Sequence, residues 1–173
     1  MLQVYQRLSH IHQPCHDSIT LDFTTRQKAR IKASTDSGQA IGIFVDRGNP
    51  LKVGEILKTE CGKLIQVNGA KEEVNTATTS DWHTFSKVCY HLGNRHTQLQ
   101  MGELWLRFKP DHVLAELAEN YGLSVRTHDA VFEPESGAYG KHSGHSHSHE
   151  NEHDHGHSHS HDHSGSHSHK HGA

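Results

Sequence analysis

The sequence predicts an α+β protein, in which a small N-terminal all-β domain precedes a ferredoxin-like βαββαβ domain and a disordered histidine-rich tail. Three changes of pattern along the chain support this prediction. Apolar residues alternate with polar ones over about the first 70 residues, extended and helical periods interleave over residues 73–132, and apolar residues nearly cease after Tyr139. A segment with so few apolar residues cannot offset its ordering entropy, so we expect disorder there without metal. The expected domains span residues 1–70, 73–139 and 140–173.

The first 70 residues follow the period of two that is typical of half-buried strands. Apolar and polar residues alternate over residues 19–23, 29–33 and 41–45, and residues 64–67 continue the series. Turn-forming residues, such as Asp36-Ser37-Gly38, separate these segments. Because the strands are short and closely spaced, we expect meander connections between them rather than crossover helices.

A strand and a helix begin the second predicted domain. Residues 73–79 (EVNTATT) are rich in β-branched residues, which favours a strand, and Ser80 or Asp81 then provides a helix N-cap. Apolar residues then recur at the spacing of one helical face: Phe85, Val88, Cys89 and Leu92. We expect this helix to end at Gly93 and Asn94, which are common at helix C-termini.

Two strands, a second helix and a last strand complete the βαββαβ order. Residues 97–101 and 103–108 have the pattern of strands joined at Gly102, and Pro110-Asp111 opens a helix that ends at Gly122. The side chains expected to face inward from this helix are Val113, Leu114, Leu117, Ala118 and Tyr121. Residues 123–132 supply the last strand, and we place the hinge between the two domains at residues 68–72.

Composition excludes several classes of function. The net charge is -3 and the Lys and Arg residues are scattered, which argues against nucleic acid as a partner. The chain begins without a leader pattern, and its longest apolar run, residues 40–45, is far shorter than the ~20 residues that span a bilayer. We therefore expect a cytoplasmic protein that does not contact membranes. No nucleophile with a base, phosphate loop or pair of carboxylates indicates an enzyme.

Metal chemistry in this chain depends on nitrogen and oxygen ligands. The three cysteines are far apart and form no CxxC motif, which argues against a thiolate zinc site or a disulfide framework. Thirteen of the 21 histidines fall in the tail: His142, His145, His147, His149, His153, His155, His157, His159, His161, His163, His167, His169 and His171. Repeated His-x-His spacing brings imidazoles together, and intervening Ser and Gly let separate pairs converge on one ion.

The tail predicts several labile metal ions rather than one tightly held ion. Neutral imidazole is the ligand, so binding should weaken below about pH 6. Imidazole suits nickel, copper and zinc, and the general affinity order favours copper, so the tail alone does not select nickel. Two other interpretations remain. The tail could be a purification tag, although such tags are usually uninterrupted runs of histidine. It could also be a solvated polar tail with incidental affinity for metal.

A second candidate site lies in the folded part, at Tyr90-His91-Leu92-Gly93-Asn94-Arg95-His96 (YHLGNRH). His96 falls at a helix-to-strand junction, where a side chain can project from a domain. One imidazole binds metal weakly, but a two-fold dimer with His96 near its axis would present two imidazoles to one ion. The alternative is a histidine that hydrogen-bonds a nearby carbonyl at the end of the helix.

Longer stretches around this motif carry a resemblance to a known family. YHLGNRH, LQMGEL, DHVLAELAENYGL and FEPESGAY occur in this order before the histidine-rich end, and TRQKAR and DRGNPLKVGEIL occur in the first domain. Together they resemble the urease accessory protein E family, the nickel metallochaperones of urease maturation. The resemblance covers most of the chain.

The resemblance implies a function, a cofactor and partners. It implies a homodimer with His96 at its interface, an N-terminal domain similar to peptide-binding domains of chaperones, and delivery of nickel to apo-urease through an accessory complex that includes a GTPase. It also implies that His112 takes part in peripheral metal binding. This sequence departs from some relatives at Lys109 and Pro110, where they carry histidine. A second metal site on the folded body is less supported for that reason.

Other candidate ligands have simpler structural interpretations. We expect His91 to have a structural role and Cys89 to pack in the core. The segment HIHQPCH has ligand-like spacing in His10, His12, Cys15 and His16, but relatives need no site there. Glu133 and Glu135 near the start of the tail are interpreted as residues of a solvated loop.

Two rival functions remain open. In the first, the protein stores or buffers nickel or zinc through its tail, and His96 is inert. In the second, it is a peptide-binding chaperone whose first domain holds a client while metal regulates it through the tail. The predicted function is instead that of a carrier, in which the tail gathers nickel near His96 and the ion passes on by ligand exchange.

Overall fold

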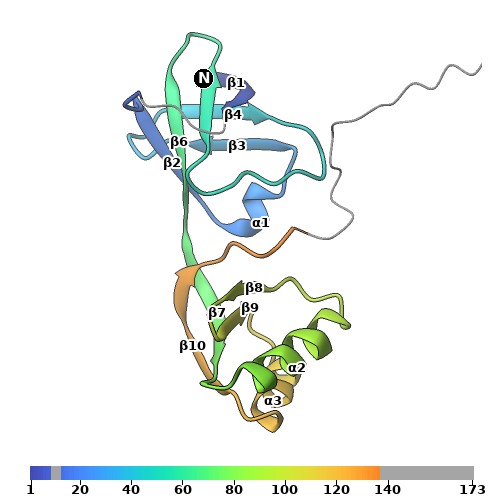
Figure 1. Cartoon of the computed structure of the whole chain (residues 1–173). Helices are drawn as coiled ribbons and strands as arrows, with labels where there is room; N and C mark the ends of the chain where they lie inside the picture. Colours follow the sequence, from blue (N-terminus) through green and yellow to red (C-terminus); the bar gives the residue numbers. More distant parts are fainter. Residues whose placement is uncertain (9–12, 137–173) are drawn as a thin grey trace, which may run out of the picture. The chain divides into compact units, whose positions relative to one another are not determined.

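A computed structural model describes residues 1–8 and 13–136 of the chain. The first part is a six-stranded sheet with the order β2-β6-β5-β1-β4-β3 (Figure 1). Its strands are β1 (Leu2–Leu8), β2 (Asp17–Leu21), β3 (Arg30–Ser34), β4 (Ala40–Phe44), β5 (Ile56–Thr59) and β6 (Leu64–Gly69). The inward-facing residues predicted by the period of two, such as Ile19, Ile31 and Ile43, are buried in its core.

The predicted meander is wrong for three of the five strand pairs in this sheet, one of which is the antiparallel pair of β1 with β5. The β3–β4 and β5–β6 pairs are antiparallel hairpin neighbours, but β1 pairs with β4 and β2 pairs with β6 in parallel. A period of two shows which side of a strand is buried and gives no information about the strand's neighbours. Parallel neighbours also require a crossover connection. The chain passes through β2 and β3 between the parallel strands β1 and β4, and part of the connection from β2 to β3 is a short helix.

That helix, α1 (Phe23–Arg26), replaces the end of the predicted strand at residues 19–23. Asp22 caps it by accepting a hydrogen bond from the Thr25 backbone N–H at 2.6 Å. Phe23 is buried, as its apolar character predicts, but on a helix. The local capping interaction therefore overrides the alternating pattern.

The second part is a four-stranded antiparallel sheet with the order β10-β7-β9-β8 and two helices on one of its faces (Figure 1). Its elements are β7 (Lys71–Thr78), α2 (Trp82–Gly93), β8 (Gln100–Gly102), β9 (Trp105–Phe108), α3 (His112–Asn120) and β10 (Ser124–Val131). The element order is the one that the periodicity predicts. Ala77 and Leu106 from the sheet pack with Val88 and Leu92 of α2 and Leu114 of α3 in one core.

Both long helices begin where the sequence predicts, and the N-cap is Asp81 rather than Ser80 in α2 and Asp111 in α3. Asp81 accepts a hydrogen bond from the Thr84 N–H at 2.7 Å, and Asp111 accepts one from the Leu114 N–H at 3.0 Å. Two of the five side chains expected inside α3 and its end are exposed instead: Val113 is 47% exposed and Tyr121 37% exposed. The helix has nine residues, so only a narrow stripe of it, centred on Leu114 and Ala118, faces the core.

One residue, Ala70, separates the two sheets along the chain, and both belong to one compact unit. Arg26 is fully buried and links the two parts. Its guanidinium donates to Glu133 Oε2 at 2.5 Å, to the Phe132 carbonyl at 2.6 Å and to the Leu51 carbonyl at 3.0 Å. We call these contacts the Arg26 junction. Glu133 therefore has a structural partner, which the sequence did not reveal.

Glu72 of β7 makes a second link between the two parts, to the backbone of α1, and also an ion pair within the second part. Lys109 pairs with Glu72, and the other carboxylate oxygen of Glu72 accepts a hydrogen bond from the Phe23 backbone N–H at 3.0 Å. Lys109, which stands in the segment where the resemblance to the family is interrupted, therefore has a structural contact. Among the residues that the structure describes, no helix is both long and apolar enough to cross a bilayer.

Candidate metal site at the end of helix α2

His96 is placed by the way helix α2 ends. The helix ends at Gly93 with Asn94 as its C-cap, as the sequence predicts, but Asn94 keeps right-handed backbone angles and the chain makes a further turn. The backbone N–H of Arg95 donates to the Leu92 carbonyl at 3.1 Å, and that of His96 donates to the Gly93 carbonyl at 3.0 Å. The left-handed residue is His96 itself, with a φ of 54°. A left-handed conformation costs a residue with a Cβ roughly 1–2 kcal/mol, so this position holds a modest local strain.

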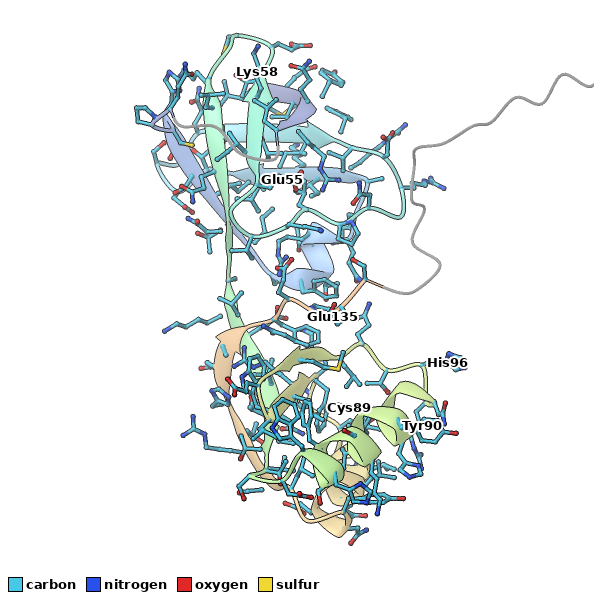
Figure 2. The ribbon with its side chains drawn as sticks, viewed as in Figure 1. Glu55, Lys58, Cys89, Tyr90, His96 and Glu135 are labelled. Carbon is cyan, nitrogen blue, oxygen red and sulfur yellow. The ribbon has the colours of Figure 1, made fainter. Side chains whose placement is uncertain are left out.

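The imidazole of His96 is free to bind a ligand. The residue is exposed, and Figure 2 shows its ring beyond the end of α2, directed away from the ribbon. The ring makes no hydrogen bond within residues 1–8 and 13–136. The alternative interpretation, a ring held by a carbonyl at the end of the helix, therefore lacks its hydrogen bond.

His91 lies in the last turn of α2 and has a different environment from His96. Its Nε2 is 2.8 Å from the Tyr121 hydroxyl, and the two rings are stacked with centroids 4.7 Å apart. This contact joins α2 to the end of α3. It also explains why Tyr121 stays half-exposed, since its ring covers His91 rather than the core. The geometry favours the structural role expected for His91.

His112 is the first residue of α3 and is exposed. The positive end of the helix dipole lies at this terminus, which does not favour a cation. No group of three or more His, Cys, Asp or Glu side chains that could hold a metal ion occurs among the described residues. A metal held by three or more such side chains at His96 or His112 thus needs ligands from a second copy of the chain or from residues outside the described ranges.

Of the remaining candidate ligands, some lie outside the described residues and others lie within them. The thirteen histidines between positions 142 and 171 lie outside the described residues, as do His10 and His12. His16 accepts a hydrogen bond from the Leu64 N–H through Nδ1 at 3.1 Å, so one ring nitrogen is engaged. Cys89 packs against the core of the second sheet, and burial raises the pKa of its thiol, which disfavours the thiolate that metals bind.

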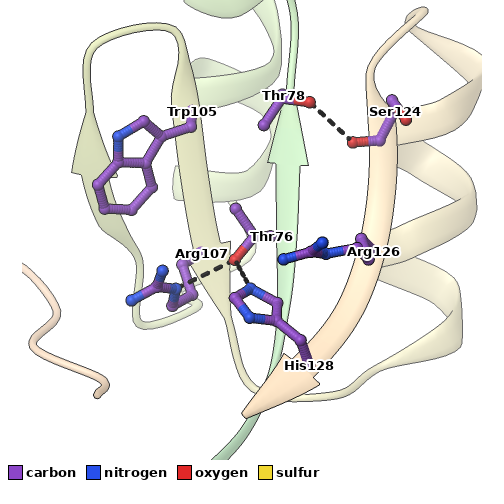
Figure 3. Close-up of a pocket in the computed structure, with 7 residues that line it drawn as sticks. All are labelled: Thr76, Thr78, Trp105, Arg107, Ser124, Arg126 and His128. Atoms are coloured by element: carbon purple, nitrogen blue, oxygen red, sulfur yellow. Dashed lines mark hydrogen bonds between the residues drawn. The ribbon is translucent and has the colours of Figure 1, made fainter. Parts of the chain in front are cut away.

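One group of polar residues was missed at the sequence level. The face of the four-stranded sheet opposite the helices has a shallow hollow of about 500 Å³ (Figure 3). The residues that line it come from three strands: Thr76, Thr78, Trp105, Arg107, Ser124, Arg126 and His128. A partial signal was present in β9, where Trp105 and Arg107 alternate with the buried Leu106 and Phe108.

The fold and the candidate ligands define a class of protein: a two-domain protein of mixed helix and strand content, with exposed histidine on its second domain. Family models show to which family within that class the chain belongs. The model described as the UreE urease accessory protein N-terminal domain matches residues 2–70, and that of the UreE C-terminal domain matches residues 72–172.

Curated relatives agree with the family models. Urease accessory protein UreE of Psychromonas ingrahamii is 69% identical over 147 residues, which cover 84% of this chain and 97% of the relative. The protein of the same name from Alteromonas mediterranea is 69% identical over 146 residues, covering 84% and 94%. That from a Marinomonas species is 51% identical, covering 84% and 100%. The chain belongs to the UreE urease accessory protein family, which implies a role in urease maturation.

Proposed function

We propose that the protein is a nickel metallochaperone that collects Ni(II) and delivers it to apo-urease during assembly of the urease metallocentre. The observation that supports this most strongly is the exposed His96, whose imidazole has no competing hydrogen bond among the described residues. The relatives are named as urease accessory proteins, and urease assembly is the process that such a carrier would serve.

The delivery site in this proposal is formed by two copies of the chain. His96 alone supplies one nitrogen, and a homodimer with His96 at a two-fold axis supplies two. Exposed apolar side chains on the same domain support such an interface: Tyr90 is 66% exposed and Met101 is 43% exposed. We also propose that this domain belongs to the ferredoxin-like class, because of its strand order β10-β7-β9-β8. The proposed location of the protein is the cytoplasm.

A site with few ligands suits a carrier. Two imidazoles leave most of the nickel coordination sphere to water or to incoming ligands, so the ion exchanges rapidly. The thirteen histidines of residues 142–171 act as the reservoir, with His112 as a peripheral ligand, and tethering raises the local nickel concentration near His96. Zinc and copper also bind imidazole, so supply and the receiving partners select nickel. Those partners are the urease apoprotein complex and its GTPase accessory protein, and the protein itself catalyses no reaction.

Calorimetric titration with nickel and with zinc tests the proposal. Four proteins are compared near neutral pH: the full chain and a chain ending at Lys141, each with and without His96→Ala. We expect the shorter chain to keep about one nickel per dimer and to lose it with His96→Ala. His83→Ala is the matched control, because His83 is an exposed histidine at the start of the same helix and should leave binding unchanged.

The opposite results favour the storage function. If the shorter chain binds no nickel, or if His96→Ala changes nothing in it, residues 142–173 hold all of the metal and His96 is not a delivery site. Sedimentation of the shorter chain with and without nickel then shows whether a dimer exists in either state.

A further inference from the structure

The helix-free face of the four-stranded sheet has an unusual charge pattern. Cross-strand neighbours place Arg126, Thr76 and Arg107 in one row and Ser124, Thr78 and Trp105 in the next. None of the described residues that line this hollow carries a carboxylate. The nearest acidic residue on the same face of β7 is Glu72, which Lys109 and the Phe23 N–H already engage. Two guanidinium groups thus share a hollow whose lining supplies no carboxylate.

The two arginines flank the central strand. Neighbouring strands are roughly 4.8 Å apart, so the Cα atoms of Arg107 and Arg126, one strand on either side of Thr76, are about 10 Å apart. Side chains of this length can converge on one group above Thr76. Figure 3 shows Arg126 and His128 reaching toward Thr76 from β10, with Arg107 on the other side.

Arg107 is held in place before any ligand binds. Its Nε donates to Thr76 Oγ1 at 3.1 Å, its Nη1 donates to the Val131 carbonyl at 2.7 Å, and its guanidinium carbon lies 5.0 Å from the centre of the Trp105 ring. Its Nη2 has no hydrogen-bond partner within the described ranges. Burial lowers the pKa of Arg107, which reflects the cost of a partly desolvated cation that an anion would offset.

The indole ring of Trp105 occupies space that Gly102 leaves open. Its cross-strand neighbour is Gly102, and a Cβ at that position would lie 2.1 Å from the indole ring. Only glycine therefore lets the indole lie over β8. The result is a broad aromatic surface beside the arginine row.

We propose that this sheet face is a binding site for a phosphate group, held by Arg107 and Arg126 above Thr76. The Thr76 hydroxyl is already engaged by Arg107 and by the His128 ring, 2.8 Å away, so the two guanidinium groups supply the donors. A phosphate has more acceptor oxygens than a carboxylate and can engage the guanidinium groups of both flanking strands at once. The phosphate can belong to a free phosphate or pyrophosphate, or to a nucleotide whose base stacks on Trp105. The site is separate from His96 and involves no metal.

Fluorescence of Trp105 tests the proposal in the full chain. Trp82→Phe removes the other tryptophan, so the remaining signal reports on the hollow. Metal is removed on a chelating resin, ionic strength is held constant with NaCl, and the protein is titrated with phosphate, pyrophosphate, ADP and citrate. We expect saturable binding that is tighter for pyrophosphate than for phosphate, and tenfold or more weaker in Arg126→Gln and in Arg107→Gln.

The controls separate the outcomes. Arg126 is exposed and makes no hydrogen bond within the described residues, so Arg126→Gln should fold normally even if Arg107→Gln does not. Arg95→Gln, an exposed arginine after α2, should bind as the parent does. ADP binding tenfold tighter than pyrophosphate identifies a nucleotide as the source, and equal binding identifies a free phosphate. The proposal is overturned if neither phosphate nor pyrophosphate saturates, if citrate binds as well as pyrophosphate, or if Arg126→Gln has no effect.

Discussion

Arg26 and His96 are both polar residues close to the end of a helix, but Arg26 is fully buried and His96 is exposed. Arg26 donates hydrogen bonds to three acceptors from two distant stretches of chain. The His96 ring makes no hydrogen bond to the described residues and stands on a left-handed backbone. The difference separates polar groups that hold the fold from polar groups that are available to a ligand.

The largest effect should come from breaking the Arg26 junction. Replacing Arg26 with Met removes a buried cation that Glu133 and two carbonyls solvate, and leaves those acceptors without their donor. We expect a loss of about 3 kcal/mol in the free energy of unfolding, because removing one partner of a buried ion pair is strongly destabilising. Urea unfolding measures it. Arg30→Met, at an exposed arginine of β3, should change stability by less than about 0.5 kcal/mol.

The same variant tests whether the junction couples the two sheets. Trp82 and Trp105 are the only tryptophans, and both belong to the second part of the chain. Fluorescence therefore follows the second part alone, whereas far-UV circular dichroism follows both. We expect the two unfolding curves to coincide in the parent and to separate in Arg26→Met. Curves that stay together in the variant would show that the Arg26 junction is not what couples the parts.

The sequence predicted features that depend on neighbouring residues better than it predicted contacts between residues far apart along the chain. The start of α2 was predicted at Ser80 or Asp81 and that of α3 at Pro110-Asp111, because a helix start depends on residues within one turn. The pairing of Arg26 with Glu133 joins residues 107 positions apart, and nothing near either residue indicates it. The parallel β1–β4 and β2–β6 pairs were missed for the same reason.

At the candidate site, the position of His96 was predicted and its backbone was not. The end of α2 at Gly93 and Asn94 was predicted correctly, but glycine usually supplies the left-handed residue after a helix, and here neither Gly93 nor Asn94 does so. In the structure Gly93 is helical and His96 takes the left-handed angles. The arginine row on the second sheet was missed because scattered arginines in the sequence come together only when three strands align.

An intermediate effect is expected at the cap of α1, next to the Arg26 junction. The hydrogen bond from the Thr25 backbone N–H holds the pKa of Asp22 below its ordinary value of 3.8. A lowered folded-state pKa means that the charged carboxylate stabilises the fold above pH 3.8, and that this contribution is lost as pH falls through the folded-state pKa. Asp22→Ala should therefore cost about 1 kcal/mol near neutral pH, and less below pH 3.8.

Asp22→Asn provides the matched control for that prediction. Asparagine also accepts the cap hydrogen bond but does not titrate, so it should keep most of the stability near neutral pH. Thermal unfolding between pH 3 and pH 7 measures both variants. If Asp22→Ala loses the same stability at every pH in this range, the charge on Asp22 contributes nothing and the cap acts only through its shape.

The smallest effect should be a gain in stability at His96. Glycine adopts left-handed angles without the Cβ penalty, so His96→Gly relieves the strain at φ 54° while adding freedom to the unfolded chain. We expect a net gain of about 0.5 kcal/mol together with loss of nickel from a chain ending at Lys141. Asn94→Gly is the matched control, since Asn94 has a φ of -64° and glycine there should destabilise the turn. A loss of stability in His96→Gly would mean that the imidazole makes a contact that holds the turn, and the contrast with Arg26 would then fail.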